Sequence, residues 1–105
     1  MRTLPITRKQ AIECLVAAEP HMRLLGVERL ALFGSVLRDE ARIDSDVDLL
    51  VTFQPGMKTF DRFWALCELL EECLGCRVEI VTIESLSPFF GPRILAEAHD
   101  VLRAA

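Results

Sequence analysis

The sequence lacks several features that would place it in a specialised class of protein. It has no apolar run of the length that a membrane-spanning helix requires, and its start, MRTLPITRKQ, has no apolar segment of the signal-peptide kind. We therefore expect a cytoplasmic protein with no membrane association. It also has no basic excess, with 12 Lys and Arg against 16 Asp and Glu. Direct binding to a nucleic-acid duplex is not expected, whereas a nucleotide is compatible because magnesium can neutralise its phosphates.

The four cysteines lack the arrangement of a zinc or disulfide site. Cys73 and Cys76 form a C-x-x-C pair, but Cys14 and Cys67 are isolated from each other. A zinc site would need a second close pair, and a redox C-x-x-C opens a helix, whereas this one closes a helix. Without an export signal a disulfide framework is not expected either. We predict four free thiols.

The chain has no repeats, low-complexity segments or linkers, and 105 residues suit a single domain over residues 1–105. Apolar periodicity and turn residues predict alternating helices and strands. The predicted order is a helix opened by a Thr7–Gln10 capping box and broken at Pro20, a further turn ending near Gly26, a strand at 29–33, a short helix after Gly34, a strand at 48–53, a helix at 59–74, a strand at 77–82 and a helix at 88–98. This pattern indicates an α+β fold, a small mixed sheet of three to four strands flanked by helices.

The two later helices carry further predictions. The helix at 59–74 is expected to bury an apolar stripe and to end at Gly75. The stripe consists of Phe60, Phe63, Trp64, Cys67, Leu70 and Leu74. The last helix is expected to take its cap from Ser85 or Ser87, with Gly91-Pro92 disturbing its start.

Carboxylates recur where the second strand begins, in the stretch FGSVLRDEARIDSDVDLLV. Asp46 and Asp48 lie two residues apart, so in a strand both point to one side. Two close carboxylates repel, and a divalent cation between them removes that cost, since magnesium and manganese prefer oxygen ligands. The D-x-D-x-D pattern also opens a calcium loop, but Leu49 and Pro55 stand where that loop needs glycine and glutamate. A solvated turn with capping aspartates stays open.

A glycine–serine pair follows the first strand, ten residues before the carboxylates. Gly34 permits close approach of a backbone or ligand, and Ser35 opens a short helix whose free N–H groups can receive phosphate oxygens. A phosphate cradle beside a metal clamp is typical of nucleotidyl or phosphoryl transfer. The other interpretation of this pair is an ordinary turn with a helix cap.

These residues resemble the Gly-Ser, ten residues, Asp-x-Asp signature of the DNA polymerase β-like nucleotidyltransferases, and in particular the minimal nucleotidyltransferase (MNT) family. The resemblance extends over nearly the whole chain, from the entry helix through LALFGSVLR, SDVDLLV and RVEIVT to RILAEA. It implies the polymerase β-like core, with Gly34 and Ser35 on the triphosphate of a nucleotide. Arg38 matches an arginine that often follows Gly-Ser in the family. Its role is either phosphate or partner contact, or an ion pair with Asp39, Glu40 or Asp44.

The resemblance also implies a magnesium site, or a manganese site, formed by Asp46, Asp48 and a third carboxylate. The matching residue of the third strand is Glu79, where close relatives usually have aspartate. A glutamate can still ligate the cation or act as a base on the attacking hydroxyl. Its longer side chain leaves catalytic competence more open than nucleotide binding.

The activity that the resemblance implies is transfer of AMP from ATP to a partner protein. Minimal nucleotidyltransferases typically act as antitoxins that modify a tyrosine of a HEPN-domain toxin, and this chain has no length for an acceptor-binding domain of its own. Three alternatives stay open. They are a binding-only antitoxin on an enzyme fold, a small-molecule nucleotidyltransferase of the aminoglycoside type that forms its site as a homo-oligomer, and a structural domain without nucleotide.

Overall fold

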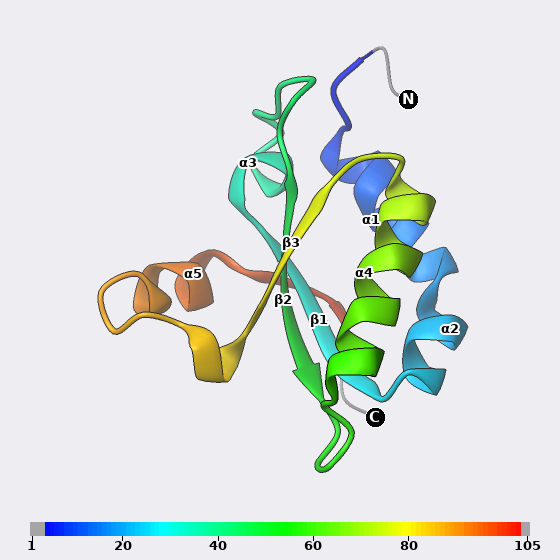
Figure 1. Ribbon diagram of the computed structural model, residues 1–105. Helices are drawn as coiled ribbons and strands as arrows, with labels where there is room; N and C mark the ends of the chain where they lie inside the picture. The colour runs from blue at the N-terminus through cyan, green and yellow to red at the C-terminus, as the bar shows by residue number, and fades with distance from the viewer. Residues whose placement is uncertain (1–3, 104–105) are drawn as a thin grey trace.

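The computed structural model describes residues 4–103 and contains, within them, one four-stranded sheet with helices around it (Figure 1). The elements are α1 (Arg8–Ala17), α2 (Glu19–Leu24), β1 (Val27–Phe33), α3 (Gly34–Leu37), β2 (Val47–Phe53), α4 (Phe60–Leu74), β3 (Val78–Thr82), the 3-10 turn η1 (Ile83–Ser85), α5 (Gly91–Glu97) and β4 (His99–Leu102). The strand order is β3-β2-β1-β4. Strand β1 runs antiparallel to β2 and β4, whereas β2 and β3 are parallel. The predicted mixed α+β sheet is confirmed.

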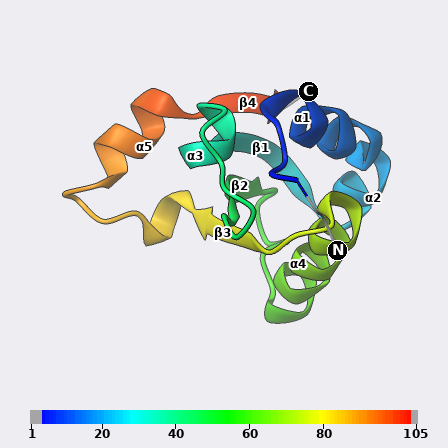
Figure 2. The same ribbon diagram turned by 90° about the horizontal axis from the view of Figure 1, so that it is seen from above.

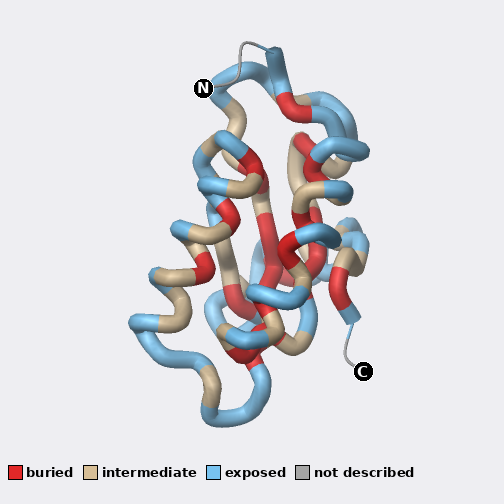
Figure 3. The backbone as a smooth tube through the Cα atoms, turned by 90° about the vertical axis from the view of Figure 1, so that its right-hand side faces the viewer, coloured by how far each residue is buried: buried red, intermediate tan, exposed pale blue. Residues whose placement is uncertain are grey.

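Helices α1, α2 and α4 cover one face of the sheet, and α5 lies on the opposite side (Figures 1 and 2). The buried residues gather between the sheet and the three helices (Figure 3). In β2 the side chains of Val47, Leu49 and Val51 are fully buried in this core. Because strand side chains alternate, Asp48 points to the face that these helices leave uncovered.

The predicted helix signals act as expected. The Thr7 hydroxyl accepts a hydrogen bond from the Gln10 N–H at 3.1 Å, and the Gln10 side chain accepts one from the Thr7 N–H at the same distance. Pro20 ends the first helix and lies in the first turn of α2, where its missing N–H costs nothing. Gly75 ends α4 with a left-handed φ of 71°.

The predicted apolar stripe of α4 is wrong in part. Leu70 and Leu74 are buried, but Phe60 and Trp64 are 79% and 59% exposed. The two exposed rings stack on each other, with centroids 6.3 Å apart. The buried face follows Leu66, Leu70 and Leu74, so the true stripe is rotated relative to the predicted one. The spacing of the aromatic residues predicted the helix correctly, but it did not predict which face of the helix is buried.

The end of the chain differs most from the prediction. Helix α5 begins at Gly91, later than expected, and neither Ser85 nor Ser87 caps it, because its N-cap is Phe90 and Pro92 sets its first turn. Strand β4, which follows α5, is missing from the elements that the sequence predicted. Its four residues are too short for a periodic pattern, and it exists because it pairs with β1.

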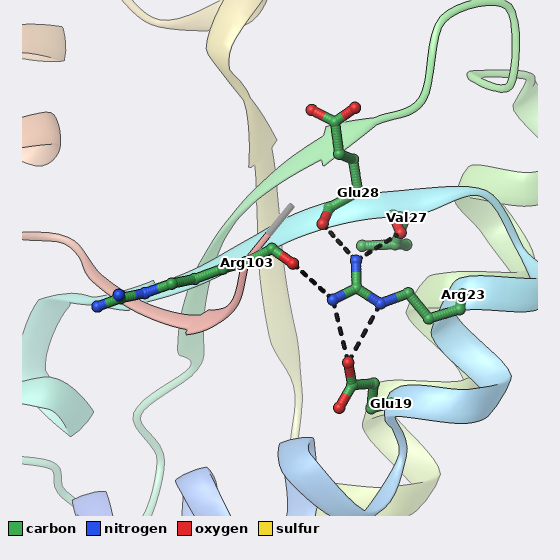
Figure 4. Close-up of polar contacts among 5 residues, drawn as sticks. All are labelled: Glu19, Arg23, Val27, Glu28 and Arg103. Atoms are coloured by element: carbon green, nitrogen blue, oxygen red, sulfur yellow. Dashed lines mark hydrogen bonds and ion pairs between the residues drawn. The ribbon is translucent and has the colours of Figure 1, made fainter. Parts of the chain in front are cut away.

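Arg23 links α2 to β1 and to Arg103, the residue that follows β4 (Figure 4). Its guanidinium donates to the Glu19 carboxylate at 3.0 Å and to the carbonyl oxygen of Arg103 at 2.7 Å. It also donates to the carbonyl oxygens of Val27 and Glu28. These bonds join one helix to the first strand and to the end of the described chain. One side chain therefore connects segments that are 80 residues apart.

The sequence predicted neither a membrane-spanning helix nor a disulfide, and both points can be compared with residues 4–103. No helix within residues 4–103 is both long and apolar enough to cross a membrane. Cys14, Cys67, Cys73 and Cys76 form no disulfide within the part of the chain that the structure describes. Burial, with the charge of Glu71, raises the pKa of Cys67 above its ordinary value. Burial and the neighbouring Cys14 do the same for Cys73, so neither thiol is poised for reaction.

Candidate active site

The sheet topology brings the predicted site residues to one end of three adjacent strands. Phe33, the last residue of β1, lies opposite Asp48, because β1 and β2 are antiparallel. Asp48 lies beside Glu79, because β2 and β3 are parallel. Residues in register on neighbouring strands are about 5 Å apart and point to the same face. The phosphate-cradle glycine after Phe33 and two of the predicted carboxylates therefore meet.

Asp48 has the most perturbed carboxyl group of the site. Burial, followed by the charge of Glu79, a hydrogen bond with Glu79 and the charge of Asp46, raises the pKa of Asp48 to about 6, and only Arg38 acts in the opposite direction. Two carboxyl groups held side by side bind protons more tightly because they repel when both are ionised. The site thus concentrates negative charge that a cation would relieve.

Gly34 is required by the closeness of Asp48. A Cβ atom at Gly34 would lie 2.1 Å from the Asp48 Oδ2, and the backbone φ of 79° is left-handed. Any side chain here would collide with the carboxylate and strain the turn. Glycine is therefore what allows the first strand to approach the second at the point where the carboxylates lie.

The turn after Gly34 is fixed from its other side. Within the described residues the Ser35 hydroxyl has no hydrogen-bond partner, so it is free to meet a ligand oxygen. Asp39, which has a left-handed φ of 61°, accepts a hydrogen bond from the Arg8 N–H at 3.0 Å. The Arg8 side chain donates to the carbonyl oxygen of Leu37 at 3.3 Å. Helix α1 therefore holds α3 in position beside the strand ends.

Arg38 forms two ion pairs, one predicted and one not. Its Nε lies 2.8 Å from Glu40, one of the partners that the sequence offered, and another nitrogen lies 2.7 Å from Glu97. Hydrogen bonding and the charges of both glutamates raise the pKa of Arg38. Glu97 also accepts a hydrogen bond from the Gly34 N–H at 2.6 Å. Sequence reasoning missed Glu97, because only the fold brings it to a turn 63 residues away.

Asp46 is the third carboxylate that the sequence predicted for this site. It precedes β2 and lies 3.8 Å from the largely exposed Arg77. Among residues 4–103 no three His, Cys, Asp or Glu side chains are already arranged as a metal-binding cluster. The donor chemistry nevertheless fits a divalent cation, because Asp48 and Glu79 supply adjacent oxygens and their repulsion raises the pKa of Asp48. Asp46, two residues away, is the remaining candidate ligand.

Comparison with known proteins decides which family carries this arrangement. A family model described as "Nucleotidyltransferase domain" matches residues 12–101. The chain belongs to this nucleotidyltransferase family. The resemblance read from the Gly-Ser and Asp-x-Asp spacing is therefore confirmed, and the chain is a nucleotidyltransferase by family.

Relatives of this nucleotidyltransferase carry a more specific name. The protein adenylyltransferase MntA of Thermococcus cleftensis is 37% identical over 93 residues, which are 88% of this chain and 93% of the relative. MJ0435 of Methanocaldococcus jannaschii, provisionally named a protein adenylyltransferase, is 44% identical over 77 residues, covering 73% of this chain and 82% of the relative.

Solved structures confirm the minimal nucleotidyltransferase fold. One provisionally described as a minimal nucleotidyltransferase has a TM-score of 0.69 and 40% identity, covering 84% of this chain and 93% of the other. A tri-AMPylated Shewanella oneidensis HEPN toxin in complex with its MNT antitoxin gives a TM-score of 0.62, covering 89% and 73% of the two chains. At 18% identity the second likeness is evidence for the fold alone.

Proposed function

We propose that this nucleotidyltransferase transfers AMP from ATP to a hydroxyl group of a partner protein, and that the acceptor is a tyrosine of a HEPN-domain toxin. The observation that carries the proposal is the convergence of Gly34, Asp48 and Glu79 at one end of the sheet. The relative named as a protein adenylyltransferase supports a protein acceptor, and the fold shared with the antitoxin of an AMPylated HEPN-toxin complex motivates the choice of a HEPN toxin.

The reaction divides between phosphate binding and activation of the acceptor. The Gly34 N–H, the Ser35 hydroxyl and the Arg38 guanidinium bind phosphate oxygens and orient the α-phosphorus. The acceptor oxygen attacks the α-phosphorus. The bond between that phosphorus and the leaving oxygen breaks, and pyrophosphate departs. The exposed Glu79 carboxylate takes the proton of the attacking hydroxyl.

A divalent cation, magnesium or manganese, would be held by Asp46, Asp48 and Glu79. When bound it supplies charge neutralisation for the phosphates and polarises the reacting oxygens. The chain's own part is to keep Asp48 and Glu79 side by side on the sheet, with Gly34 packed against Asp48. The raised pKa of Asp48 means that its ionised form, the one that binds a cation, predominates above pH 6.

The test uses ATP labelled on its α-phosphate, with magnesium or manganese and a HEPN-domain protein encoded beside this chain. Label should move to the partner with the wild type and be lost with Asp46→Asn and Glu79→Gln. Asp44→Asn is the matched control, because Asp44 is an exposed carboxylate in the same loop. If no label moves but the partner is still bound and silenced, the transferase proposal fails and the chain is a binding antitoxin.

A further inference from the structure

The carboxylate of Glu97 lies where a phosphate oxygen is expected. Its Oε1 accepts a hydrogen bond from the Gly34 N–H at 2.6 Å and another from the Arg38 guanidinium at 2.7 Å. These two donors are the ones assigned above to the phosphates of the nucleotide. One anionic oxygen shared by a backbone amide and an arginine is also the pattern by which proteins hold phosphate.

Glu97 can leave this position without unfolding its surroundings. It is the last residue of α5, and its side chain is 34% exposed. A hollow of about 290 Å³ opens beside it, so that the carboxylate and an incoming anion have room to exchange. The hollow is lined by Phe33, Gly34, Arg38, Phe90, Arg93, Ile94 and Glu97.

We infer that Glu97 closes the phosphate-binding end of the site in the free protein, and that the polyphosphate of a nucleotide must displace it to bind. The inference rests on the proposed function, because it assigns the Gly34 and Arg38 donors to phosphate. A carboxylate and a phosphate cannot share these donors, since their charges repel. The apparent affinity for polyphosphate is therefore the intrinsic affinity multiplied by the fraction of molecules in which Glu97 has left the site.

The expected size of this competition follows from the exposure of the ion pair. Partly exposed ion pairs contribute little to stability, so removing Glu97 should tighten polyphosphate binding by roughly three- to tenfold. A residue that only held Arg38 in place would give the opposite sign, because its loss would loosen the guanidinium. The direction of the change therefore separates competition from positioning.

The experiment measures binding of inorganic tripolyphosphate by calorimetry to the wild type and to Glu97→Ala. Glu40→Ala is the near control, because Glu40 also pairs with Arg38, at 2.8 Å, but makes no bond to Gly34. Glu84→Ala is the remote control, because it makes the same change in net charge at a pair with Lys58. We expect tighter binding for Glu97→Ala, a smaller gain for Glu40→Ala and the wild-type affinity for Glu84→Ala.

The amide proton resonance of Gly34 gives a readout that is independent of activity. It should move upfield in Glu97→Ala, which removes its acceptor, and return downfield when tripolyphosphate is added. The inference is overturned if Glu97→Ala binds as the wild type does or more weakly, if it only matches Glu40→Ala, or if none of these proteins binds tripolyphosphate. If binding behaves as expected but no AMP is transferred, the inference stands and the proposed function fails.

Discussion

Replacing Asp48 with asparagine should stabilise the fold at pH 8 and change its stability little at pH 4. The pKa of Asp48 is raised from 3.8 to about 6, so the folded state binds this proton more tightly than the unfolded chain. The stabilisation from that proton is fully present below pH 4 and is lost as the pH rises through 6. The ionised carboxylate is then a net cost, which the neutral asparagine lacks.

The magnitude follows from the size of the shift. About two pKa units correspond to about 3 kcal/mol for a group wholly removed from water. Asp48 is partly exposed, so solvent screening reduces the cost to about 1–2 kcal/mol at pH 8. For a chain of this size that is a gain of about 5–10 °C in Tm for Asp48→Asn.

Urea unfolding at pH 4, 5, 6, 7 and 8 with a chelator present measures this difference directly. Asp44→Asn is the control, because it removes the same charge from an exposed position and should give a small difference at every pH. Magnesium should then raise the stability of the wild type at pH 8 and leave Asp48→Asn nearly unchanged. If Asp48→Asn stabilised the protein equally at every pH, the raised pKa of Asp48 would be refuted as the cause.

Three further predictions test the site and the fold. Gly34→Ala should cost more stability in urea unfolding than Gly56→Ala. Both glycines have a left-handed φ, but an added Cβ would collide with Asp48 at Gly34 and would meet open space at Gly56. Equal costs would mean that backbone strain alone matters. Arg23→Ala should lose about 2–3 kcal/mol and speed amide exchange in β4, and Arg23→Lys should not restore the loss, because an ammonium lacks the guanidinium's fork. Glu79→Gln should slow AMP transfer by about a hundredfold or more, while Glu79→Asp retains measurable rate; equal rates for Gln and wild type would exclude Glu79 as the base.

Local signals in the sequence predicted the elements from α1 to β3 well. The capping box at Thr7, the break at Pro20 and the end of α4 at Gly75 each depend on neighbouring residues, so they are readable without a partner segment. Strands β1, β2 and β3 were predicted to within two residues because their apolar runs are bounded by glycine or polar residues. Such features depend on residues that are close together in the sequence.

Features that depend on contacts between distant parts of the chain leave no such local signal, so they were not predicted. Strand β4 is held by pairing with β1 and by the ion pair of Arg29 with Asp100 at 2.7 Å, neither of which leaves a local pattern. The phase of the apolar stripe on α4 depends on how that helix meets the sheet, which placed Phe60 and Trp64 outside. The sequence predicted Asp48 and Gly34 as parts of one site through their spacing, but Glu97 required the folded chain.

Departures from ordinary folding rules gather at one end of the sheet, and this supports an active site there independently of any family. Val47 and Leu49 satisfy the core, yet Asp48 between them carries a carboxylate beside Glu79 where an uncharged side chain would cost nothing. Gly34 gives up side-chain contacts so that the first strand can approach that carboxylate. Proteins place such costs where a ligand offsets them. Under the proposed function, a cation would relieve the repulsion between Asp48 and Glu79 and a phosphate would accept the Gly34 N–H, so one nucleotide with its metal would offset both costs.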